Sequence, residues 1–199
     1  MRRVYILILS AALFGCGGGE EENSETSTDS TTVETEVSEE NVEKPKKKPK
    51  SPRVQASGMV DGVQVDIDYG SPFVKGRTIW GELVPYDKVW RAGANEATSI
   101  TFDGDILFAD AEVAAGTYAL FIKPVAEGDW QVILNEEWSK EEHGVWGAYD
   151  HDPTKDVARI DIAPDWRQEL EESMRFSVVN AGIEFAWEYV AFTVGIEAQ

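Results

Sequence analysis

Apolar and polar residues alternate with a period of two through much of the chain after residue 53. Between Val63 and Tyr69 the apolar side chains take every second position, with glutamine and aspartate between them. Alternation of this kind is typical of strands with one buried face. Further strand-like stretches lie at residues 100–102, 106–108, 118–122, 130–134, 157–162, 174–179, 183–189 and 190–196. Turn signals such as Asp103-Gly104-Asp105 separate them, so the pattern predicts about nine short strands.

No stretch keeps an apolar period of 3.6 residues, and only residues 164–173 are expected to hold a short helical turn. Short strands without intervening helices favour an antiparallel arrangement. We therefore predict that residues 53–199 form an all-β globular domain, which is an antiparallel β-sandwich or a barrel-like variant.

The first residues have the pattern of an export signal. Two arginines precede an apolar run that is too short to span a bilayer, so residues 1–15 are predicted to be a signal peptide. Cys16, the single cysteine, follows Gly15 and resembles the conserved cysteine of the bacterial lipobox. The resemblance implies lipidation of Cys16 and an outer-membrane lipoprotein of the cell envelope, periplasm-facing or exposed on the cell surface. The alternative is an ordinary signal peptide with a chance cysteine.

Residues 16–52 have the composition of a linker. Ten acidic residues lie between Glu20 and Glu43, and a run of lysine and proline follows from Lys44 to Lys50. Almost no apolar residue is present, so we predict a disordered spacer. A flexible chain of this length would reach roughly 30–35 Å from the membrane.

The charge balance restricts the partners of the domain. The chain has a formal charge of −19, and residues 54–199 hold 27 acidic and 10 basic residues. Such a surface repels nucleic acid, so no nucleic-acid partner is predicted. The predicted partners are the membrane, through the lipid on Cys16, and a small molecule, carbohydrate or protein ligand.

One long segment, Ser71–Asn95, interrupts the regular series of strands. It contains two tryptophans, two arginines and three glycines, and it follows neither a strand nor a helix period. A long irregular segment of this composition is either a binding loop or a structural plug on the core, and the sequence leaves both open.

Several short motifs resemble a known family. They are Ser71-Pro72, Gly76-Arg77, Trp80-Gly81, Val89-Trp90-Arg91 and Trp146-Gly147-Ala148-Tyr149-Asp150. Their order resembles the uncharacterised secreted family called domain of unknown function 2911, common in Bacteroidetes, over residues 51–197. The resemblance implies a periplasmic or surface β-rich domain and implies no activity.

Candidate ligand-binding residues come from the same motifs. Arginine offers a planar fork of donors for carboxylate or phosphate, and tryptophan can stack on a sugar or an apolar ligand. The candidates are Arg77, Trp90, Arg91, Asn95, Trp146 and Tyr149. Locking of the irregular segment onto the sheet is the alternative role for these side chains.

A cation site is a further candidate. Asp150, His151, Asp152 and Asp156 could ligate a metal from one loop, although turn capping explains the same residues. No cofactor and no catalytic residue are predicted. The sequence thus favours a lipid-anchored binding or accessory module over a structural envelope lipoprotein that acts through protein contacts. A carboxylate- or metal-dependent hydrolase is the weakest alternative.

Overall fold

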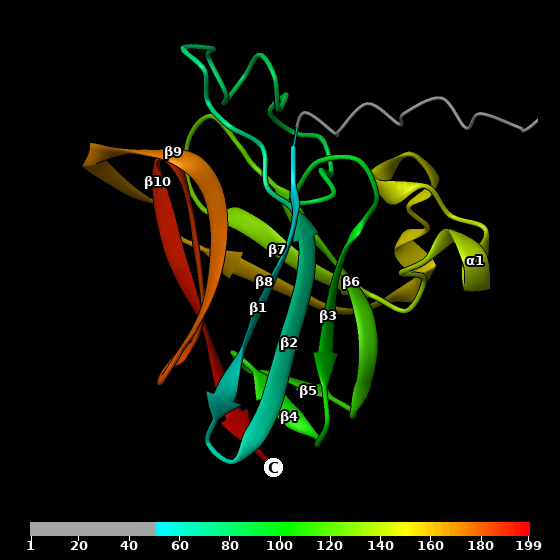
Figure 1. Ribbon diagram of the computed structural model, residues 1–199. Helices are drawn as coiled ribbons and strands as arrows, with labels where there is room; N and C mark the ends of the chain where they lie inside the picture. Colours follow the sequence, from blue (N-terminus) through cyan, green and yellow to red (C-terminus); the bar gives the residue numbers. More distant parts are fainter. Residues whose placement is uncertain (1–50) are drawn as a thin grey trace, which may run out of the picture. The chain divides into compact units, whose positions relative to one another are not determined.

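The computed structural model describes residues 51–199. The predicted signal peptide, Cys16 and nearly all of the predicted linker lie outside the described residues. Within residues 51–199 the backbone forms two antiparallel sheets, connected by short turns and by two longer irregular segments (Figure 1).

The larger sheet has six strands, in the order β1-β2-β3-β6-β7-β8. Their bounds are Arg53–Val60 for β1, Val63–Gly70 for β2, Thr98–Phe102 for β3, Gly116–Lys123 for β6, Trp130–Asn135 for β7 and Asp156–Ile162 for β8. Side chains alternate across this sheet as the sequence pattern predicts. In β2, Val63, Val65, Ile67 and Tyr69 are buried against the second sheet.

The smaller sheet has four strands, in the order β5-β4-β10-β9. Their bounds are Ala111–Val113 for β5, Ile106–Phe108 for β4, Gly182–Ala198 for β10 and Asp165–Val179 for β9. The long strands β9 and β10 form a single hairpin of antiparallel pairs. The inner faces of the two sheets enclose one hydrophobic core, to which both contribute aromatic side chains such as Phe102 and Phe185.

The edges of the two sheets approach each other on both sides of the core. Strand β1 lies beside β9, and β5 lies beside β8. A Cβ atom on Gly58 of β1 would be 3.0 Å from Cβ of Val178 in β9, so the absence of a side chain permits this close approach. The prediction of an all-β antiparallel sandwich is confirmed, with ten strands in the described residues.

The β9–β10 hairpin differs from the prediction in two ways. Residues 164–173 hold no helical turn, because β9 already begins at Asp165. The stretch 183–196 is one strand interrupted by a bulge at Glu188, whose φ of 56° is positive. The bulge shifts the alternation by one residue. Tyr189 is therefore 41% exposed and Val190 is buried.

The segment between β7 and β8 carries the helical turns found in residues 51–199. They are α1 at Lys140–His143 and the 3-10 turns η1 at Gly147–Asp150 and η2 at Pro153–Lys155. Trp138 and Ala148 of this segment pack on Ala119, Phe121 and Ile133, which lie on the outer face of β6 and β7. No described helix is long and apolar enough to cross a bilayer.

Candidate functional site

The irregular segment between β2 and β3 is fastened at its first residues to the edge of β9. Val74 donates its backbone N–H to the carbonyl of Glu172 at 2.8 Å, and Met174 donates to the carbonyl of Pro72 at 2.9 Å. These bonds form an isolated antiparallel β-bridge between Phe73 and Ser173, so the segment begins in contact with the edge of the smaller sheet.

The middle of the segment fills the end of the core. Val74, Ile79, Trp80 and Val84 are buried, and Ile79 is completely inaccessible to solvent. The ring of Trp80 packs against that of Trp130 in β7, with the centroids 4.6 Å apart. This part of the segment acts as a structural plug, because its large apolar side chains fill the end of the core between the sheets.

The last part of the segment is held against Gly70 of β2 and against β6. A Cβ atom on Gly70 would lie 2.0 Å from the carbonyl oxygen of Ala94, so the chain can cross β2 only at a glycine. Trp90 exchanges two backbone hydrogen bonds with Ile122 of β6, at 2.8 and 2.9 Å. The side chains of Trp90 and Arg91 are thereby presented from a fixed backbone.

A cavity of about 640 Å³ lies beside this segment. Its volume falls within the range of roughly 300–1,000 Å³ that is usual for small-molecule sites. Residues from the segment, from the turn η1 and from β10 line it. They are Ser51, Pro72, Arg77, Leu83, Val84, Pro85, Lys88, Val89, Trp90, Arg91, Gly93, Ala94, Ala148, Tyr149 and Trp187.

Tryptophan rings form the aromatic part of the cavity wall. Trp90 and Trp187 are stacked, with centroids 5.5 Å apart and ring planes 19° from parallel. Trp80 contacts both of them edge-on, at 6.0 Å and 5.7 Å. Trp187 is buried and Trp90 is half-buried, so Trp90 offers the more accessible of the two stacked rings.

Arg91 lies against the turn η1 on the other side of the cavity. A Cβ atom on Gly147 would lie 2.9 Å from Cδ of Arg91, so a side chain at position 147 would disturb Arg91. The φ of Gly147 is 55°, a conformation that also favours glycine. The guanidinium lies 5.8 Å from the centroid of the Tyr149 ring, and Tyr149 is 81% exposed. Within residues 51–199 the guanidinium of Arg91 forms neither a hydrogen bond nor an ion pair, and only the backbone carbonyl of Arg91 accepts a bond, from the N–H of Thr98.

Buried hydrogen-bond donors without a partner occur in residues that line this cavity or pack behind its wall. Three buried side-chain nitrogens in the described residues have no hydrogen-bond partner, namely Nε1 of Trp80, Nε of Arg91 and Nε1 of Trp187. Two of the three residues line the cavity, and Trp80 packs against Trp187. Because an unpaired buried donor costs about 1–3 kcal/mol, such groups are rare in folded proteins.

A comparison with protein families gives a match over residues 51–196 to a family described as "Protein of unknown function (DUF2911)". The match covers well over half of the 199-residue chain. The chain belongs to this family. The family resemblance read from the sequence motifs is thus confirmed. No curated protein and no solved structure matches the chain.

The DUF2911 domain brings four of the six candidate ligand-binding residues together. Arg77, Trp90, Arg91 and Tyr149 all line the cavity. Their common location rests on two segments that are about 60 residues apart in sequence, since the first three precede β3 and Tyr149 follows β7.

Asn95 and Trp146 lie elsewhere. Asn95 has a positive φ of 67°, and its side-chain amide donates to the carbonyl of Ser51 at 3.5 Å, so it supports the turn. Trp146 lines a second cavity of about 330 Å³, where Lys140 Nζ lies 4.8 Å from the centroid of its ring.

Among the lining residues that the sequence did not indicate, Trp187 and Lys88 carry the groups most suited to binding. Trp187 follows the alternating core pattern of β10, and its ring extends from that core to the cavity. Lys88 belongs to no motif, although its position two residues before Trp90 in an acidic domain is a signal that could have indicated it.

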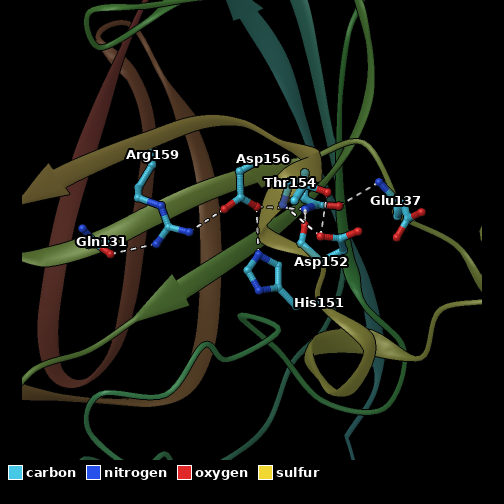
Figure 2. A network of polar contacts seen from close by, with 8 residues as sticks. Gln131, Glu137, His151, Asp152, Thr154, Asp156 and Arg159 are labelled. Carbon is cyan, nitrogen blue, oxygen red and sulfur yellow. Dashed lines mark hydrogen bonds and ion pairs between the residues drawn. The ribbon is translucent and has the colours of Figure 1, made fainter.

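Three of the four proposed metal ligands, His151, Asp152 and Asp156, take part in a network of polar contacts (Figure 2). The buried carboxylate of Asp156 lies 2.8 Å from Nε2 of His151 and accepts a hydrogen bond of 2.8 Å from Asn135 Nδ2. Arg159 donates to the other oxygen of Asp156 and, at 2.9 Å, to Gln131. Protein donors therefore surround this carboxylate.

The other two aspartates cap turns. Asp150 accepts a hydrogen bond from the backbone N–H of Trp146 at 2.7 Å. The carboxylate of Asp152 accepts hydrogen bonds from both the backbone N–H and the hydroxyl of Thr154. These two bonds lower the pKa of Asp152. Residues 51–199 contain no group of three or more His, Cys, Asp or Glu side chains arranged to hold a metal ion.

Proposed function

We propose that this protein is a lipid-anchored binding module of the cell envelope, which takes up a small organic ligand in the cavity beside Trp90 and Arg91. The anchor is the lipid expected on Cys16, and the charged linker that follows Cys16 would hold the domain away from the membrane. The cavity supplies the binding site.

The observation that carries the binding function is a cavity of ligand size that is lined by Trp90 and by Arg91, whose guanidinium has no partner in the described residues. A purely structural segment is expected to pair its buried donors within the protein. Here Nε of Arg91 and Nε1 of Trp187 have no partner in the described residues. A pocket of ligand size with polar groups left free next to aromatic rings is the usual arrangement of a small-molecule site.

The competing functions receive less support from the same residues. An envelope protein acting only through protein contacts does not require a cavity of ligand size lined by an unpaired guanidinium. A hydrolase that uses carboxylates or histidine requires such groups at the site, and the described lining of the cavity holds neither an acidic residue nor a histidine.

Ligand binding is tested by thermal-shift screening of the full chain against small organic molecules. A ligand at 100 times its Kd stabilises the native state by about 2.7 kcal/mol. This corresponds to a rise in Tm of roughly 5–10 °C for a domain of this size. Tyr149→Ala should abolish the shift, because Tyr149 lines the cavity and its exposure makes the change harmless to folding.

Tyr189→Ala is the matched control, since Tyr189 is also partly exposed and does not line the cavity. If a ligand binds Tyr149→Ala and the wild-type chain with the same affinity, that result excludes this cavity as the binding site. The anchor is tested separately by incorporation of radiolabelled palmitate in cells, which should occur in the wild-type chain and be absent in Cys16→Ser.

A further inference from the structure

The cavity is basic, whereas the domain that surrounds it is strongly acidic. Three of its lining residues are cationic, namely Arg77, Lys88 and Arg91, and none is acidic. Residues 54–199 as a whole hold 27 acidic residues and only 10 basic ones. Charged residues chosen at random from this domain would therefore be mostly carboxylates. The charged residues of the cavity wall have the opposite sign to most of those in the rest of the domain.

The protein does not neutralise these three cations. Arg53, Lys155, Arg159, Arg167 and Arg175 each form an ion pair with a carboxylate in the described residues. Within residues 51–199 Lys75, Lys123 and Lys140 form none, and neither do the three cavity cations, despite the large excess of acidic residues. Their charge thus remains available to a bound molecule.

The two arginines differ in how firmly they are held. Arg77 donates from Nε to the carbonyl of Val74 at 3.1 Å and from Nη2 to the carbonyl of Phe73. Two of its nitrogens are therefore engaged, and the side chain is fixed as an exposed charge at the rim. Arg91 has no such bond and lies beside the Tyr149 ring. Arg91 is the cation best able to turn its donors toward a ligand.

Apolar residues set the character of the rest of the ligand. Leu83, Val84, Pro85 and Val89 line the cavity together with the half-buried Trp90. These side chains offer contact to aromatic or aliphatic groups, and they offer few partners to the hydroxyl groups of a sugar. The lining therefore fits a molecule with an anionic group at one end and an apolar body.

We propose that the ligand is an organic anion, whose carboxylate or phosphate group binds Arg91 with support from Lys88 and Arg77, and whose apolar body lies against Trp90. The inference rests on the proposed binding function and adds the chemical class of the ligand. Arginine suits this role because its fork of N–H groups matches the two oxygens of a carboxylate or phosphate.

The test uses ligand series that share one apolar body. Phenylacetate, phenylacetamide and benzyl phosphate form one series, and indole-3-acetate and indole-3-acetamide form another. They are included in a wider panel of organic carboxylates and phosphates with the matching amides and alcohols. Affinities are measured by thermal shift and calorimetry on the full chain at low and high salt.

The anions should bind about tenfold or more tightly than their neutral counterparts, which is the effect of one charge-assisted hydrogen bond. Arg91→Gln should remove this preference. Arg91→Lys keeps the charge and should retain part of it, so loss of folding is distinguished from loss of recognition. Lys123→Gln removes a charge away from the cavity and should change nothing. The ratio of carboxylate to phosphate affinity identifies which anion the site prefers.

Four results would overturn the inference. Equal affinity for acid and amide in the wild-type chain contradicts an anion site, as does a preference for acids that survives in Arg91→Gln. Binding of neutral compounds alone, lost in Tyr149→Ala, would refute the anion while leaving the proposed binding function intact. If neither the small-molecule screen nor this panel shifts the Tm, the result counts against both the anion inference and the proposed binding function.

Discussion

Trp80 provides the most direct test of how the segment between β2 and β3 is attached to the core. Its side chain is 6% exposed and contacts Trp90, Trp130 and Trp187. Burial of a tryptophan removes up to about 250 Å² from water, which is worth at most about 6 kcal/mol at 25 cal/mol per Å². Measured losses for Trp→Ala in cores are about 3–5 kcal/mol, so we expect Trp80→Ala to destabilise the domain by this amount.

Trp80→Phe should behave differently. It removes part of the ring, but it also removes the unpaired Nε1–H, whose burial costs about 1–3 kcal/mol. The two effects oppose each other, and the expected net loss is about 0–2 kcal/mol. The difference in unfolding free energy between the two variants separates the contribution of packing from the cost of the unpaired donor.

Urea unfolding followed by far-UV circular dichroism measures both losses, with an unchanged m-value as the check that unfolding stays two-state. Trp166→Ala is the control, because Trp166 is 54% exposed and should cost about 1 kcal/mol or less. A loss below about 1.5 kcal/mol for Trp80→Ala, or one equal to that of Trp166→Ala, would show that the segment is not a plug.

Three further variants test other parts of the fold. Gly70→Ala should cost about 2 kcal/mol or more in urea unfolding, because its Cβ would lie 2.0 Å from Ala94 O, and a smaller loss would contradict that crossing. Asp156→Asn should cost about 2–4 kcal/mol by the same assay, since it alters a buried, multiply bonded carboxylate. Partial burial opposes ionisation of Glu184, but bonds from Arg175 and Arg167 outweigh it and lower its pKa below the ordinary 4.5. Its stabilising effect is therefore present above pH 4.5 and lost as the pH falls through the lower folded-state pKa, so Glu184→Gln should flatten this part of an acid-unfolding curve.

The architecture could be predicted because each sheet buries one face, which imposes a period of two on the sequence. Strand β2 shows this clearly, since its four alternating apolar residues are all buried. Strand β1 was not predicted, because Ala56, Ser57 and Gly58 give it little apolar contrast. The bulge at Glu188 was not predicted either, since a positive φ at a glutamate leaves no mark in the hydrophobic pattern.

The site could be predicted only in part, for a geometrical reason. The composition of the segment indicated Arg77, Trp90 and Arg91, but sequence spacing does not show which way a turn directs its neighbours. Gly147, with φ of 55°, separates Trp146 from Tyr149. As a result, Trp146 lines the second cavity and Tyr149 lines the first. A motif that reads as one unit in the sequence is divided between two places in the structure.

The two roles considered for the irregular segment are compatible, because different residues perform them. Ile79 and Trp80 face the core and are buried, while Arg77 and Lys88 are exposed at the cavity. A loop that merely covered the core would gain stability by pairing its cations with the abundant carboxylates of this domain. The three cavity cations form no such pair in the described residues, so the plug explains how the segment is held and leaves its basic face unexplained. The proposed binding of an anion would account for that face, and the plug would supply the fixed backbone that such binding requires.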